Sequence, residues 1–137
     1  MKIKLLSAIF ISLLIGFSFS SCKKTDDKKD KTTAERIQGT WHLDTDIYHD
    51  FFDNDHYYDT TKGGPNDIIE FRSDGKVYLN IDGETDTTIY EILGESKLVI
   101  AGNVTYDIKT LTETLLVMYS KQVSGNDYTE ETMTLKR

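Results

Sequence analysis

The sequence predicts an all-β fold: an eight-stranded antiparallel up-and-down meander closed as a barrel, preceded by one short helix. After residue 40, apolar and polar residues alternate with a period of two in seven or eight segments, as in strands with one buried face. Turn signals such as Ser73-Asp74-Gly75 and Gly125-Asn126 separate these segments. Eight such strands can remove their exposed edges by closing the first onto the last. A two-layer β-sandwich is the alternative.

The first 21 residues predict a secretory signal. Two lysines lie in the first four residues, an apolar run follows over residues 5–19, and small residues precede Cys22. The apolar run is shorter than the roughly 20 residues that a membrane-spanning helix needs. We therefore expect residues 1–21 to be a signal peptide.

Cys22 is the one cysteine of the chain, so no internal disulfide can form. The sequence Ser20-Ser21-Cys22 resembles the lipobox of bacterial lipoproteins, in which the cysteine is acylated and becomes the first residue of the mature chain. The resemblance implies fatty acyl chains such as palmitate on Cys22 and a place in the cell envelope, as an outer membrane lipoprotein on the periplasmic or the surface side. Two or more acyl chains hold a protein stably on a membrane.

Residues 22–32 predict a flexible tether, since residues 23–31 include no apolar side chain that could be buried. Loss of residues 1–21 would leave 14 of the 16 basic residues against 23 acidic ones, a net charge of −9. This charge argues against nucleic acid or an anionic lipid surface as the partner, because phosphate-binding surfaces carry a positive excess.

The folded domain is expected over residues 33–137. Thr32 and Glu35 form a capping-box pattern, and Gly39 is suited to end the short helix. The first strand then places Trp41, Leu43 and Ile47 on a buried face, with Asp46 and Tyr48 on the polar face. Residues 49–66 are expected to form a loop that ends at Gly63-Gly64-Pro65.

The turns set the register of the later strands, because residues directly opposite each other share a face of the sheet. The same apolar face continues through every hairpin. The expected pairs are Phe71–Val77, Ile69–Leu79, Tyr90–Ile100, Ile92–Leu98, Ile100–Val104, Leu98–Tyr106, Ile108–Leu116, Tyr106–Met118, Met118–Met133 and Leu116–Leu135.

Gly39-Thr40-Trp41, which follows a short helix and opens the meander, resembles the Gly-x-Trp signature of lipocalins. Together with residues 69–78 it is similar to the lipocalin-like domains of small Gram-negative envelope lipoproteins. The resemblance implies that Trp41 plugs the closed end of the barrel and that the interior takes a small apolar ligand.

Two binding sites are predicted as alternatives. The first is an interior pocket, since an eight-stranded barrel has room for packed side chains or for one small ligand. Its candidate residues are Leu43, Phe71, Leu79, Tyr90, Ile100, Tyr106, Met118 and Met133. The second is the aromatic loop 48–58 at the barrel mouth, which would bind a glycan, peptide or protein through Phe51, Phe52, Tyr57 and Tyr58. A packed structural barrel without a ligand is the third alternative.

No residue pattern predicts catalysis, a cofactor or a metal. A nucleophilic triad and a glycine-rich phosphate loop between a strand and a helix are both missing from the sequence. His42, His49 and His56 recur every seven residues, but on one extended strand this spacing would place His42 and His49 on opposite faces. We therefore expect a binding protein and not an enzyme.

Overall fold

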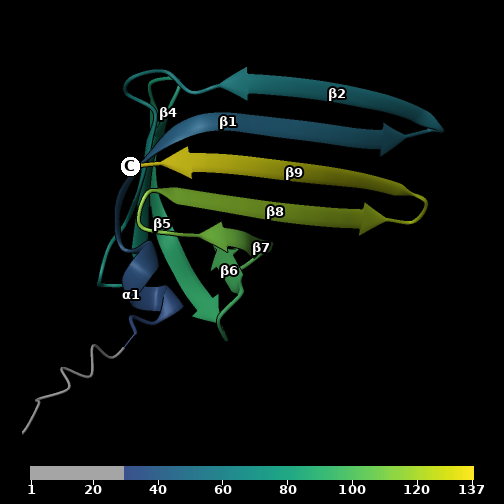
Figure 1. Ribbon diagram of the computed structural model, residues 1–137. Helices are drawn as coiled ribbons and strands as arrows, with labels where there is room; N and C mark the ends of the chain where they lie inside the picture. The colour runs from purple at the N-terminus through teal and green to yellow at the C-terminus, as the bar shows by residue number, and fades with distance from the viewer. Residues whose placement is uncertain (1–29) are drawn as a thin grey trace, which may run out of the picture.

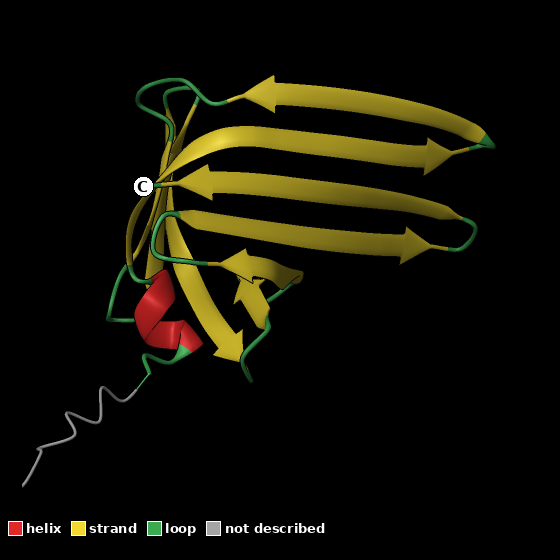
Figure 2. Ribbon diagram, in the orientation of Figure 1, coloured by secondary structure: helices red, strands yellow, loops and turns green. Residues whose placement is uncertain are grey.

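The computed structural model describes residues 30–137, so the predicted signal, Cys22 and most of the tether lie outside the described residues (Figure 1). Eight antiparallel strands close into a barrel, as predicted, and one further strand lies beside it (Figure 2). No helix within residues 30–137 has the length and apolar composition needed to cross a membrane. The elements are α1 (Thr33–Ile37), β1 (Gly39–Phe52), β2 (Asp55–Lys62), β3 (Ile68–Phe71), β4 (Lys76–Ile81), β5 (Glu84–Leu93), β6 (Lys97–Ile100), β7 (Val104–Leu111), β8 (Leu115–Ser124) and β9 (Asp127–Lys136).

The barrel closes through β1, which pairs with β3 on one edge and with β9 on the other. Only residues 39–42 of β1 pair with β3, whereas residues 45–52 pair with the additional strand β2. The far halves of β1, β9 and β8 therefore continue past the barrel with β2 as a four-stranded sheet in the order β2-β1-β9-β8 (Figures 1 and 2). We call residues 45–52, 55–62, 120–124 and 127–132 the projecting sheet.

Helix α1 covers one end of the barrel because its side chains reach the β5–β6 turn and the end of β7. Thr33 Oγ1 donates to the Glu95 carbonyl at 2.9 Å, and the Arg36 guanidinium donates to the Leu111 carbonyl. Thr32 and Glu35 cap the helix reciprocally, as the sequence predicts. This is the closed end of the barrel.

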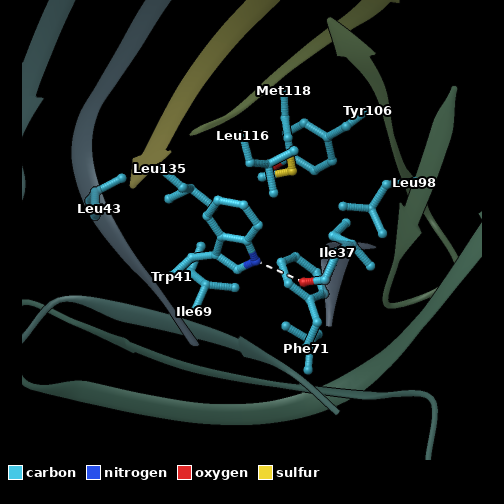
Figure 3. Close-up of a cluster of buried hydrophobic side chains, with 11 residues drawn as sticks. Ile37, Trp41, Leu43, Ile69, Phe71, Leu98, Tyr106, Leu116, Met118 and Leu135 are labelled. Atoms are coloured by element: carbon cyan, nitrogen blue, oxygen red, sulfur yellow. Dashed lines mark hydrogen bonds between the residues drawn. The ribbon is translucent and has the colours of Figure 1, made fainter. Parts of the chain in front are cut away.

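Trp41 lies fully buried at the closed end (Figure 3). Its indole Nε1 donates to the Ile37 carbonyl at 2.7 Å, and the Arg137 guanidinium stands 3.9 Å from its ring. The buried core around it comprises Ile37, Leu43, Ile69, Phe71, Val77, Leu98, Tyr106, Leu116, Met118 and Leu135.

Most of the predicted pairings are confirmed. The predicted turns of the β3–β4 and β8–β9 hairpins are present. The predicted registers of β5–β6 and β6–β7 are also observed. The predicted β7–β8 register is wrong. An irregularity between Ile108 and Thr110 shifts the pairing, so Ile108 faces Met118 and Leu111 faces Leu116.

A second irregularity in β1, between Leu43 and Thr45, overturns the predicted faces of the first strand. An extra residue reverses every later side chain, because successive strand residues point to opposite faces. Asp46 is paired with Met133, and Met133 with the buried Met118, so Asp46 and Tyr48 lie on the interior side. Ile47 faces outward and is 41% exposed.

The predicted loop over residues 49–66 is mainly a β-hairpin. β1 runs to Phe52 and β2 begins at Asp55, so Asp53 and Asn54 make a two-residue turn. Both turn residues have positive φ, 52° and 67°, as a type I′ turn requires. Phe51, Phe52, Tyr57 and Tyr58 therefore lie on strands.

Candidate functional site

The predicted interior residues all lie on the inner side of the barrel, but they are not equally buried. Leu43, Phe71, Tyr106 and Met118 are buried, while Leu79, Tyr90, Ile100 and Met133 are partly buried and pack against them. Figure 3 shows Trp41, Phe71, Leu98 and Met118 converging inside the barrel. Tyr90 has a structural role, since its hydroxyl donates to the Arg72 carbonyl at 2.9 Å and its ring meets Phe71 edge-on.

Toward the projecting sheet, the apolar interior gives way to polar side chains. Tyr106 donates its hydroxyl to Glu131 Oε2 at 2.7 Å, and both residues are buried. Burial, followed by the negative charge of Glu131, raises the pKa of Tyr106 and of Tyr48 well above the usual value. Both hydroxyls therefore keep their protons and act as donors next to Glu131.

Asp46 carries the least satisfied carboxylate among the described residues. Its Oδ1 is buried without a hydrogen-bond partner within residues 30–137. Burial, followed by repulsion from Glu131 and Asp59, raises the pKa of Asp46 to about 6. A ligand that brings a positive charge or a hydrogen-bond donor would relieve this repulsion.

The side of the projecting sheet that continues the barrel interior, here called the inner face, is acidic and aromatic. The strand alternation, counted from Asp46, and the cross-strand pairs place six carboxylates and the rings of Tyr48, Phe52 and Tyr57 on this face. The projecting sheet has no lysine, arginine or histidine on this face. The carboxylates are Asp46, Asp50, Asp55, Asp59, Asp127 and Glu131, and none forms an ion pair with another described residue.

An open groove of about 620 Å³ lies at the tip of the projecting sheet. Phe52 and Tyr57, which are 63% and 59% exposed, line it together with Asp50 and Asp127, and Phe51, Val123 and Tyr128 line it from the opposite side of the sheet. Rigid aromatic rings and unpaired carboxylates thus meet at one solvent-accessible place.

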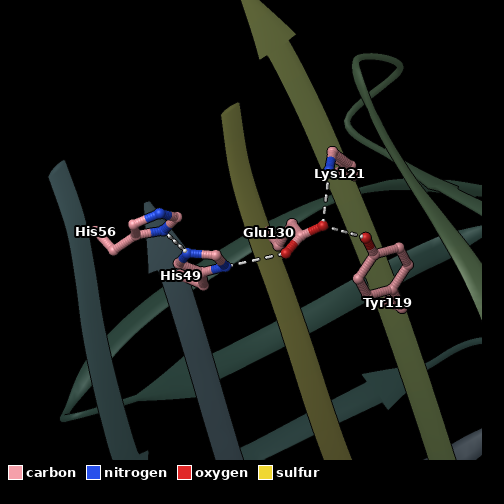
Figure 4. A network of polar contacts seen from close by, with 5 residues as sticks. All are labelled: His49, His56, Tyr119, Lys121 and Glu130. Carbon is pink, nitrogen blue, oxygen red and sulfur yellow. Dashed lines mark hydrogen bonds and ion pairs between the residues drawn. The ribbon is translucent and has the colours of Figure 1, made fainter. Parts of the chain in front are cut away.

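The opposite side, the outer face, carries a satisfied network centred on Glu130 (Figure 4). This carboxylate accepts hydrogen bonds from His49 Nδ1 at 3.0 Å and from Tyr119 and Lys121, each at 2.8 Å. These bonds, led by the one from Lys121, lower the pKa of Glu130 to about 2. Glu130 and Lys121 therefore neutralise each other on this face, and Lys62 is its other lysine.

The four predicted mouth aromatics are divided between the two faces. Phe52 and Tyr57 are paired with Asp55 and Asp50 on the inner face, whereas Phe51 and Tyr58 are paired with His56 and His49 on the outer face. Asp46 and Glu131 were not predicted as site residues, and Tyr48 was predicted only as part of the aromatic loop 48–58. The β1 bulge that turns Asp46 and Tyr48 inward leaves no mark in the apolar pattern, and Glu131 meets them only through strand pairing.

The histidines also differ from the prediction. The bulge places His42 and His49 on the same outer side, yet His42 stays beside the barrel, opposite Ile68 and Lys136. The hairpin instead brings His49 and His56 together. Residues 30–137 contain no group of three or more histidine, cysteine or acidic side chains placed to hold a metal ion.

A scan against models of known protein families finds no match, and a search of curated proteins finds no relative of this chain.

Proposed function

We propose that this protein is a lipid-anchored binding protein of the bacterial envelope that recognises a basic segment of a peptide or protein on the inner face of the projecting sheet. The observation that carries the proposal is the segregation of charge. Six carboxylates without ion-pair partners share that face with three exposed rings, and all basic side chains of the projecting sheet lie elsewhere.

The chemistry of this face fits lysine and arginine side chains. Carboxylates attract the cations over several ångströms, and an ammonium or guanidinium group gains about 0.5 to 2 kcal/mol over an aromatic ring, depending on its desolvation. Phe52 and Tyr57 on neighbouring strands supply such rings next to Asp50 and Asp127. Because each aromatic side chain has only two side-chain torsions, little side-chain entropy is lost on binding.

Acylation of Cys22 and a tether over residues 22–32, followed by a lipocalin-like domain, are part of the same proposal. The acidic domain, in a chain of net charge −7, would be repelled by anionic lipid and so held off the surface that anchors it. Residues 23–31 of the tether are lysine, aspartate and one threonine, and they give the domain freedom to reach a partner.

The charge proposal is tested by titrating a labelled lysine- and arginine-rich peptide into the protein and measuring fluorescence anisotropy. The inner-face variant Asp50→Asn with Asp127→Asn should bind at least tenfold more weakly at low salt, and added salt should weaken the wild type. The outer-face variant Glu130→Gln is the control. Equal losses in both variants, or no binding by the wild type at low salt, would contradict the proposal.

A small apolar ligand in the barrel interior is the second candidate function. It is favoured by Leu79, Ile81 and Ile100, which face the interior and remain partly exposed. A fluorescent fatty acid should then bind the wild type, and Leu79→Trp or Ile100→Trp should abolish that binding. If the probe binds all three proteins equally, the interior is not its site.

A further inference from the structure

We propose that His49 and His56 form a binding site for a divalent transition-metal ion, Cu²⁺ or Zn²⁺, on the outer face of the projecting sheet. This inference is independent of the proposed function, because it concerns the opposite face. Neutral imidazole nitrogens are ligands that both ions favour. Figure 4 shows the two rings pointing toward each other from β1 and β2.

The two ligands are close because of the β1–β2 hairpin. His49 Nε2 stands 2.9 Å from His56 Nδ1, and the ring centroids are 5.2 Å apart. Two nitrogens of a tetrahedral zinc site, at Zn–N distances of about 2.0–2.1 Å, lie roughly 3.3 Å apart. An ion therefore needs the nitrogens to separate by a few tenths of an ångström and the His56 ring to rotate, which is allowed because His56 is exposed.

Glu130 prepares His49 for this role. The carboxylate accepts a hydrogen bond from Nδ1–H of His49, so the lone pair of Nε2 is directed at His56. Lys121 and Tyr119 hold Glu130 in place from the other side. A carboxylate bonded to the far nitrogen is the usual means of orienting a metal-binding histidine.

The metal-free contact is an ordinary hydrogen bond in which His56 Nδ1 donates to His49 Nε2. When an ion binds, His56 carries its proton on the exposed Nε2 instead, and both lone pairs face the ion. The described residues offer no third histidine, cysteine or acidic ligand, so water or a partner's donor atoms complete the coordination. We therefore expect reversible binding at an open site.

The test is isothermal titration of the full chain with Zn²⁺, together with the electron paramagnetic resonance spectrum of bound Cu²⁺. His49→Ala and His56→Ala should each weaken binding at least tenfold, and the spectrum should change from two nitrogen ligands to one. Glu130→Gln should weaken Zn²⁺ binding about tenfold, as expected for loss of the group that orients a ligand.

His42→Ala is the matched control, since His42 lies on the same strand near the barrel. The affinity of the His42→Ala variant for Zn²⁺ should equal that of the wild type. The proposal is overturned if His42→Ala loses as much affinity as His56→Ala, or if the His49→Ala/His56→Ala variant binds Zn²⁺ as tightly as the wild type. Because His56 is exposed, His56→Ala should keep the wild-type circular dichroism spectrum.

Discussion

At the scale of single residues, Trp41 fixes the closed end of the barrel. Its ring is fully buried, its indole donates to the Ile37 carbonyl, and the Arg137 guanidinium covers it. Trp41→Ala should lower the free energy of unfolding by about 3 to 5 kcal/mol, as other truncations of buried aromatics do. Denaturation in urea measures this change, and a loss below about 1 kcal/mol would show that the ring is not a core residue.

Asp46 makes the opposite kind of contribution. Its pKa is about 6 in the folded protein against an ordinary value of 3.8, so the folded state binds the proton more tightly than the unfolded state. Ionisation of Asp46 therefore lowers stability as the pH rises from about 4 to 6. Asp46→Asn should stabilise the protein at pH 7 by about 1 to 2 kcal/mol, allowing for partial exposure of the carboxylate, and should have little effect near pH 4.

Urea denaturation of Asp46→Asn and the wild type at the two pH values checks this difference. A variant less stable than the wild type at pH 7 would mean that the Asp46 carboxylate is satisfied in the folded state. Glu130 has the reverse dependence, because its lowered pKa gives stability that is present above about pH 4.5 and lost toward pH 2.

At the scale of elements, the β1–β2 hairpin depends on the turn at Asp53 and Asn54. Asn54 has a φ of 67°, which a β-branched residue adopts only with strain of about 1 to 3 kcal/mol. Asn54→Val should speed amide hydrogen exchange in β2 and the facing half of β1, and should leave the barrel strands protected. Asp55→Val, one residue later in β2, is the control and should exchange like the wild type.

The barrel elements could be predicted from sequence because each has one buried face. Phe71 faces Val77 and Met118 faces Met133, as the apolar alternation and the turn lengths require. The projecting sheet could not be predicted in this way, since both of its faces meet solvent and carry polar and aromatic residues. The bulges after Leu43 and Ile108 also leave no apolar signal, and so Asp46 was assigned to the wrong face.

At the scale of the whole molecule, the fold separates packing from recognition. The closed half of the barrel is filled by the core around Trp41, while the projecting sheet offers an acidic inner face and an outer face on which Glu130 is paired with Lys121. The predicted interior residues account for stability, and half of the predicted mouth aromatics lie on the face that we propose for binding. The clustering of the inner-face carboxylates could not be predicted from the sequence, because they come together only through the pairing of β1, β2 and β9.

The proposed anchor also acts on the whole molecule. Cys22→Ser should move the protein from the membrane fraction to the soluble fraction, because the acyl chains supply the membrane affinity. Fractionation followed by immunoblotting measures the change. A Cys22→Ser protein that stays with membranes would rule out acylation as the means of attachment.

The central claim is that the inner face of the projecting sheet is the recognition surface. It is tested most directly by removing aromatic rings from one face at a time. Phe52→Ser with Tyr57→Ser removes two inner rings, and Phe51→Ser with Tyr58→Ser removes two outer rings from the same two strands. The affinity of each variant for the basic peptide is compared at fixed salt. We predict at least a tenfold loss for the inner pair, about 1.4 kcal/mol, and an unchanged affinity for the outer pair. An unchanged affinity for the inner pair, or a larger loss for the outer pair, would contradict the claim.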